Sequence, residues 1–268
     1  MRYCDAHNHL HDERFGGRQE EFLAACRAAG IVRMVVNGSC EQDWPHVAAL
    51  AHAHPDFIIP SFGYHPWYVH ERTPCWLELL KRCLDESPGS VIGEIGLDRW
   101  KPGLSYDGQE EVFAAQLELA AQRNLPASIH CLHAWGRMHD LLRTKPRPAR
   151  GFLLHSYGGA QEMVTPLASL GAYFSLPGYY AHERKARQRE TFRHVPADRL
   201  LIETDAPDQS LPDALNEHAL FDPASGRALN HPVNLPAVYR FAAGLLQQST
   251  KDLVAKVEEN FLRLFGPG

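Results

Sequence analysis

The sequence has no long apolar segment. Among its 268 residues, no apolar run approaches the roughly 18 residues that a membrane-spanning helix requires. The first five residues, Met-Arg-Tyr-Cys-Asp, lack the apolar core of a secretory signal peptide. We therefore expect neither a membrane span nor secretion.

Cysteine is also scarce, and it is scattered. The six cysteines include no Cys-x-x-Cys pair: Cys4, Cys26, Cys40, Cys75, Cys83 and Cys131. This spacing argues against a disulfide framework and against a zinc site built from thiolates. Free thiols in a reducing cytoplasm are the expectation.

The chain has no excess of positive charge. Its net charge is −5, whereas strong nonspecific binding of nucleic acid usually goes with a basic domain. If the protein acts on nucleic acid, it must hold a few phosphates locally, for instance through metal ions. The one basic stretch, residues 184–189, falls on a predicted helix, and neighbouring glutamates dilute its charge. A solvated helix face is the interpretation that this pattern favours.

Short apolar runs alternate with longer amphipathic segments along the whole chain. The runs that predict strands are 3–6, 31–36, 57–62, 91–94, 127–130, 151–155, 172–175 and 200–203. The segments that predict helices are about 18–29, 41–53, 74–87, 108–124, 135–144, 160–170, 182–193 and 234–265. Alternation of this kind indicates parallel βαβ units, and eight of them fit a closed α/β barrel, the (β/α)8 or TIM barrel.

An open, doubly wound sheet is the alternative fold. It would usually carry a glycine-rich phosphate turn after the first strand, where this chain has His7-Asn8-His9. We therefore predict a single barrel domain over residues 1–268. The proline-containing segment 206–230 reads as a long loop after the last strand, on the face where barrel active sites lie.

His7 and His9 are separated by one residue. On a strand, such residues face the same side, and neutral imidazole is the commonest metal ligand in proteins. A surface cluster of histidines is the plainer interpretation, because the chain contains 16 of them. The choice depends on whether further ligands occur where the fold would bring them.

Further residues of ligand type do stand at predicted strand ends. Together with the histidine pair they are His7, His9, Glu94, His130, His155 and Asp205. Taken singly, each has an ordinary explanation: Glu94 as a partner of Arg99, for example, or Asp205 as a helix cap. Because all these strand ends meet at one rim of a barrel, the set as a whole predicts a metal site.

The number of ligands suits two divalent ions. We expect His7, His9 and Asp205 to hold one ion and His130 and His155 the other, with Glu94 as the bridge. Such a pair of ions activates a water for hydrolysis, and Asp205 is the predicted general base. No lysine ends the fourth or fifth strand, which disfavours a carboxylated lysine bridge. Mg, Mn, Zn, Co and Ni all remain candidates.

Two further residues receive predicted roles near these ligands. His65, in Gly-Tyr-His-Pro after the third strand, could bind a substrate phosphate or protonate a leaving group, or it could be structural. Glu203 precedes Asp205 by two residues and is predicted to orient a ligand histidine.

At these residues the chain resembles the TatD family of metal-dependent hydrolases. The resemblance covers nearly the whole chain through an ordered set of segments: Asp-Ala-His-Asn-His-Leu (5–10), Gly-Tyr-His-Pro (63–66), Gly-Glu-Ile-Gly-Leu-Asp (93–98), Ile-His (129–130), Leu-His-Ser-Tyr-Gly-Gly (154–159), Glu-Thr-Asp-Ala-Pro (203–207) and Asn-Phe-Leu-Arg-Leu-Phe (260–265). It implies a (β/α)8 barrel, two divalent metals and DNase activity, including exonuclease action at 3′ ends. It also places the six ligand residues in the family's metal positions and His65 beside the substrate phosphate.

One departure bears on the substrate. Where DNase-like members tend to have Asn-Glu-Pro, this chain has Asn230-His231-Pro232 after a long insertion. The leading prediction is a phosphodiesterase acting on DNA ends. Hydrolysis of a small amide, lactone or phosphate ester is the alternative, and a non-catalytic scaffold is the third. No protein partner is predicted.

Overall fold

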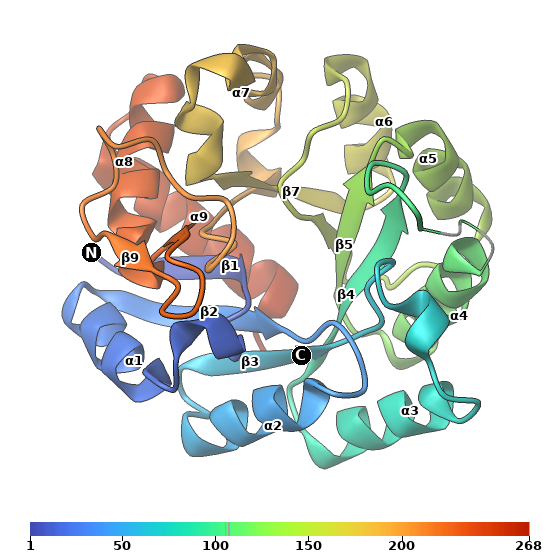
Figure 1. The fold of residues 1–268 in the computed structure, drawn as a ribbon. Coiled ribbons are helices and arrows are strands. Elements are labelled where there is room, and N and C mark those ends of the chain that lie inside the picture. Colours follow the sequence, from blue (N-terminus) through green and yellow to red (C-terminus); the bar gives the residue numbers. More distant parts are fainter. Residues whose placement is uncertain (105, 107, 268) are drawn as a thin grey trace.

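Eight parallel strands form a barrel in consecutive order, from β1 to β8 (Figure 1). The computed structural model describes residues 1–104, 106 and 108–267. The strands are β1 (Tyr3–Asn8), β2 (Ile31–Asn37), β3 (Ile58–Phe62), β4 (Val91–Asp98), β5 (Ala127–Leu132), β6 (Phe152–Leu154), β7 (Ala172–Pro177) and β8 (Leu200–Glu203). Backbone bonds just beyond β8 join it to β1: the N–H of Asp205 donates to His7 O at 3.0 Å, and that of His9 to Ala206 O at 2.7 Å. The predicted TIM barrel is confirmed.

Helices surround the barrel and bury its outer face (Figure 1). The α-helices are α1 (Gln19–Ala28), α2 (Trp44–Ala53), α3 (Trp76–Glu86), α4 (Gln109–Arg123), α5 (Trp135–Thr144), α6 (Val164–Ser169), α7 (Ala186–Phe192), α8 (Leu235–Leu245) and α9 (Thr250–Phe265). Short 3-10 turns are η1 (Glu13–Phe15), η2 (Val69–Glu71), η3 (Gln161–Met163), η4 (Gly178–Ala181), η5 (Glu183–Lys185), η6 (Ala197–Arg199) and η7 (Pro232–Asn234). Among the described residues, none of the helices combines the length and apolarity needed to cross a membrane.

The predicted helix over residues 234–265 is wrong in one respect, because it is two helices. The chain leaves the helical conformation after α8, and Ser249 then caps α9: its Oγ accepts a hydrogen bond from the N–H of Asp252 at 3.1 Å. The sequence Ser-Thr-Lys-Asp is a helix-start signal that the apolar periodicity had hidden.

Strand β4 continues past the position where it was predicted to end. Glu94 lies inside the strand, at an irregularity of the β4–β5 register between Ile92 and Ile95. Such irregularities redirect a side chain, and here they turn Glu94 into the mouth of the barrel. Gly96 then lies so close to β5 that a Cβ would be 1.9 Å from the carbonyl oxygen of His130. No other residue type fits there.

The segment after β8 is not entirely a loop. It contains a small antiparallel hairpin of β9 (Leu220–Phe221) and β10 (Ala228–Leu229). Residues 208–211, at its beginning, line the cavity described below. The six cysteines are all free thiols.

Candidate metal centre

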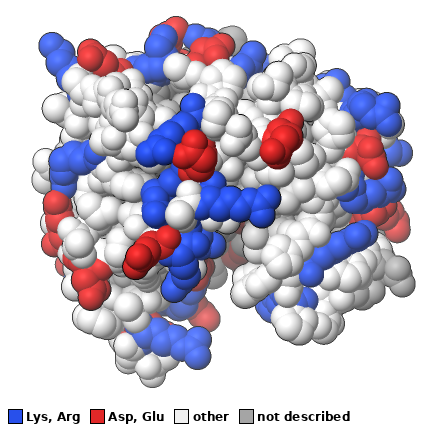
Figure 2. All heavy atoms as spheres, turned by 90° about the horizontal axis from the view of Figure 1, so that it is seen from above, with Lys and Arg blue, Asp and Glu red and all other residues white. Residues whose placement is uncertain are grey.

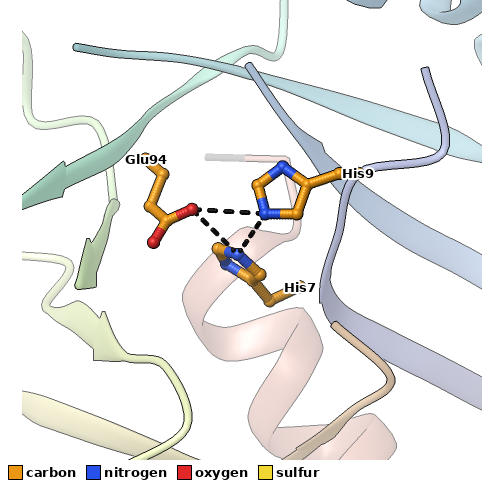
Figure 3. Close-up of side chains that lie close together, drawn as sticks. All are labelled: His7, His9 and Glu94. Carbon is orange, nitrogen blue, oxygen red and sulfur yellow. Dashed lines mark hydrogen bonds and ion pairs between the residues drawn. The ribbon is translucent and has the colours of Figure 1, made fainter. Parts of the chain in front are cut away.

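Glu94 stands at the centre of a cluster of histidines inside the barrel mouth, and 2% of its surface is exposed. Its Oε2 atom lies 3.3 Å from the Nε2 atom of His7 and 3.3 Å from the Nε2 atom of His9. Figure 3 shows both rings, which come from β1 and the residue after it, turned toward the carboxylate from β4. The two Nε2 atoms are 3.3 Å apart.

The second oxygen of Glu94 faces a different set of rings. Its Oε1 atom lies 2.9 Å from His155 Nε2, 3.0 Å from His130 Nδ1 and 3.3 Å from His65 Nε2. The carboxylate therefore has one oxygen toward each of two groups of histidines. This is the geometry required of a ligand that bridges two cations.

Asp205 joins the first of these groups. Its Oδ1 atom lies 3.6 Å from the Nε2 atoms of both His7 and His9. The six residues predicted as ligands are thus brought together at one end of the barrel, divided between the two groups as the sequence predicted. Their roles as ligands stay predictions.

His65 lies beside Glu94 and His130, within the second group of rings. Its ligand atom and those of Glu94 and His130 all lie within 4.8 Å of one another. His65 is therefore placed to act as a further ligand of the second group. His65 also lines the cavity, so its predicted contact with substrate is compatible with this position.

Hydrogen bonds on the outer side of the rings set the protonation of their inner nitrogens. His9 Nδ1 is 2.7 Å from the carbonyl oxygen of Asn37, and since a carbonyl can only accept, the proton is on Nδ1. His7 Nδ1 shares a hydrogen bond of 2.8 Å with Ser128 Oγ. Protein partners that hold the outer nitrogen in this way leave the inner lone pair available to a cation.

Asp98 is a residue of this site to which the sequence pattern gave no role. It is buried, and its Oδ2 atom lies 3.0 Å from His130 Nε2 and 2.6 Å from Trp67 Nε1. Strand alternation could have identified Asp98, because it follows Glu94 by four residues on one strand and residues at that spacing share a face.

Glu203 lies beneath the second group of rings. Its Oε1 atom is 3.7 Å from His155 Nδ1 and accepts hydrogen bonds from the N–H and Oγ–H of Ser156. This position agrees with a residue that orients His155. The role stays a prediction.

Burial shifts the pKa of each side chain in this site so as to favour its uncharged form. Hydrogen bonds and attraction between the histidines and carboxylates act in the opposite direction. Burial lowers the pKa of His7 to about 3 and raises that of Asp205 to about 7. Burial acts the same way on His9, but hydrogen bonding and attraction to Glu94 outweigh it and raise the His9 pKa to about 9.

The donor set fits divalent cations. Imidazole nitrogens approach one another at 3.3 Å, both within the His7–His9 pair and between His130 Nδ1 and His155 Nε2. A divalent cation would satisfy the buried nitrogen lone pairs and carboxylate oxygens that converge on common points. Imidazole with carboxylate is a combination that Zn, Mn, Co and Ni accept.

A cavity of about 830 Å³ opens above the cluster. It is lined by His9, His65, Glu94, His130, His155 and Asp205 from the cluster itself, and by residues of the loops that follow β1, β2, β3, β4, β7 and β8. The predicted ligand residues that border the cavity can therefore be reached from it.

The family model described as TatD related DNase matches residues 4–266. The chain is 35% identical over 261 residues to the 3′-5′ ssDNA/RNA exonuclease TatD of Edwardsiella piscicida, with 96% of both chains covered. It is 30% identical to the protein of the same name from Pantoea vagans, again with 96% of both chains covered. The crystal structure of a TatD homologue from Escherichia coli K12 has the same fold, with a TM-score of 0.88, 24% identity and coverage of 99% of this chain and 98% of the other. The sequence, the barrel and these similarities together establish that this chain belongs to the family of TatD-related DNases.

Proposed function

We propose that this protein is a divalent-metal-dependent hydrolase of phosphodiester bonds that removes nucleotides from the 3′ ends of DNA or RNA. The observation that carries the proposal is the position of Glu94, which presents one oxygen to each of two histidine groups below an open cavity. The relatives in Edwardsiella and Pantoea, both named 3′-5′ ssDNA/RNA exonucleases, support the direction and the substrate class.

We further propose two ions per chain. His7, His9 and Asp205 would hold one, His65, His130 and His155 the other, and Glu94 both. When bound, a pair of divalent ions supplies an activated water and stabilises the charge that develops on the phosphoryl oxygens.

The residues of the chain would divide the remaining work. Asp205 borders the cavity beside His7 and His9, so its carboxylate is placed to accept the proton of an attacking water. Gln209 Nε2 donates to Asp205 Oδ2 at 2.5 Å and holds the other oxygen in place. Glu203 would keep the His155 ring oriented.

Two observations favour nucleic acid over a small molecule as substrate. The cavity is open, and its mouth carries Arg184 and Lys185, which form no ion pair with a carboxylate within the part of the chain that the structure describes. A scaffold without activity is disfavoured because the complete donor set is preserved. The free thiols suit a reducing cytoplasm, and we propose that location.

The experiment uses a single-stranded oligonucleotide labelled at its 5′ end and the protein loaded with Mn²⁺. We expect a ladder of labelled products that shorten from the 3′ end. His155→Ala should abolish the ladder, whereas His194→Ala, at an exposed residue just after α7 and away from the cavity, should leave it unchanged. Equal and slow degradation by the wild type and His155→Ala would exclude nuclease activity. Turnover of a lactone or amide without any ladder would favour a small-molecule substrate.

A further inference from the structure

Two walls of the cavity mouth combine aromatic rings with cations. The first wall consists of Trp67 and Trp100, which line the cavity, with Lys101 packed against the Trp67 ring. The second consists of Tyr179, Tyr180, Arg184 and Lys185. We propose that these walls hold one unpaired nucleic-acid strand, with Trp100 stacking on a base and Arg184 and Lys185 contacting backbone phosphates. The inference rests on the proposed function and adds how the substrate is held.

The first wall follows β3 and β4. Trp67 Nε1 donates to Asp98 Oδ2 at 2.6 Å, which fixes the indole, and Lys101 Nζ lies 4.0 Å from the centre of its ring. Trp100 lines the cavity, yet 55% of its surface is exposed. A large aromatic side chain held open at the mouth of a polar site is a surface on which a base can stack.

The second wall follows β7. Arg184 lies 5.3 Å from the ring centre of Tyr179 and donates to its hydroxyl at 2.7 Å, and Lys185 Nζ lies 4.8 Å from the same ring. Both cations line the cavity. Arg184 is exposed, as the solvated face predicted for residues 184–189 requires, and η5 brings it and Lys185 to the edge of the cavity before α7 begins. Figure 2 shows lysine and arginine side chains gathered over the region of α7, with a few acidic ones among them.

The two walls face each other across the site. β3 and β7 are four strands apart in the consecutive order of the eight-stranded barrel. Loops that follow such strands lie on opposite sides of the barrel mouth. Glu94 and its histidines lie at the bottom of the cavity between them. A strand that rests on both walls therefore passes over the metal centre.

The charges at the mouth favour a polyanion. Arg14 is neutralised, because it forms ion pairs with both Asp12 and Asp208. Within the described part of the chain, Lys101, Arg184 and Lys185 form no ion pair with a carboxylate. Arg184 and Lys185 therefore offer positive charge on one side of a cavity that also holds the carboxylates of Asp43, Glu94 and Asp205, whose charge two bound divalent cations would offset.

The chemistry of these side chains selects an unpaired strand without selecting its sequence. Every base has a face that stacks on an aromatic ring, but in a duplex both faces are occupied by neighbouring base pairs. Lysine and arginine contacts with phosphate carry no sequence information. We therefore expect preference for single strands and tolerance of base composition.

The test measures binding by fluorescence anisotropy of metal-loaded protein. The probe is a labelled single-stranded oligonucleotide with phosphorothioate linkages, which resist cleavage. Arg184→Ala with Lys185→Ala should lower affinity roughly tenfold and reduce the slope of log affinity against log salt by about 1.4. Trp100→Ala should lower affinity by roughly tenfold. Matched controls are Arg187→Ala, exposed on α7 but outside the cavity, and Phe221→Ala, an exposed aromatic of β9.

The same variants are then measured on an oligonucleotide with ordinary phosphodiester linkages, where we expect the wall variants to raise KM. Hydrolysis of bis(p-nitrophenyl) phosphate by the control variants Arg187→Ala and Phe221→Ala should proceed at the wild-type rate. Unchanged oligonucleotide affinity in both wall variants, or equally tight binding of a blunt duplex, would overturn the inference. Binding that depends on the walls without any hydrolysis would overturn the proposed function and leave this inference standing.

Discussion

Asp98 fixes the His130 ring through a hydrogen bond of 3.0 Å to Nε2, while the Nδ1 atom of the same ring lies 3.0 Å from Glu94 Oε1. A carboxylate accepts only, so Asp98 keeps a proton on Nε2, and a bound cation would take the lone pair of Nδ1, the atom that faces Glu94. Carboxylates behind a ligand histidine set its tautomer and raise its basicity.

Asp98→Asn should therefore lower metal affinity or activity by about 10- to 100-fold. The Asn side chain can donate as well as accept, so it no longer requires a proton on Nε2 of His130, and the proton can move to Nδ1. Metal titration of the purified variant is the measurement, and Asp140→Asn, exposed on α5, is the control. Unchanged affinity for the cation would show that Asp98 serves to hold Trp67 and the backbone of Trp100 and Lys101 instead.

Addition of metal should stabilise the folded protein. Binding at a concentration of 100 times Kd contributes about 2.7 kcal/mol, which for a chain of this size corresponds to a rise in Tm of about 5–10 °C. Removal of the metal with a chelator should reverse this rise in Tm. Glu94→Gln should abolish most of the shift, because both groups of histidines lose their shared carboxylate. Glu86→Gln, at the exposed end of α3, should behave as wild type in differential scanning calorimetry.

Asn260 should contribute to stability without contributing to activity. It is buried on α9, and its Nδ2 donates to the carbonyl oxygens of Ala197 at 2.8 Å and Leu200 at 2.9 Å, which ties the last helix to the start of β8. Asn260→Ala leaves these carbonyls without their donor and should cost about 1–3 kcal/mol.

Urea unfolding measures this cost, with Lys251→Ala on the exposed side of α9 as control. Activity per folded molecule should be retained, since Asn260 does not line the cavity. An unchanged urea midpoint would mean that water replaces the amide at no cost.

His231 should make stability depend on pH. Burial, together with nearby His218 and Arg18, lowers its pKa to about 4, and its Nδ1 accepts a hydrogen bond from the N–H of Val233 at 3.1 Å. The unfolded chain has an ordinary pKa of about 6.5. Between these values the unfolded state binds a proton that the folded state does not, so stability rises with pH through this window and is lost as the pH falls.

His231→Gln should flatten this part of the curve of unfolding free energy against pH. Urea midpoints measured at several pH values between about 4 and 6.5 give the slope. His70→Gln, on an exposed residue, should keep the wild-type slope. A variant curve parallel to that of the wild type would show that His231 is not the group responsible.

Errors in the sequence-based prediction have specific causes. The break between α8 and α9 was missed because apolar periodicity continues through it, although Ser249 and Asp252 signal a new helix start. Glu94 was placed at a strand end because the pattern cannot register an irregularity in strand pairing. The position of Arg184 at the cavity edge could not be predicted, because helical periodicity does not describe the 3-10 turn before α7.

The sequence by itself determined the barrel, its strand order and the end of the barrel at which the ligand-type residues gather. The barrel and its strand order follow from the alternation of apolar and amphipathic segments. The common location of the ligand-type residues follows because the C-terminal ends of all parallel strands lie at the same rim of a barrel. Only the tertiary structure decided which atoms meet: the two oxygens of Glu94 with two groups of rings, Asp98 with His130, and the two walls across the mouth. Those contacts join residues far apart in the chain, and their distances depend on packing, which no local pattern of residues encodes.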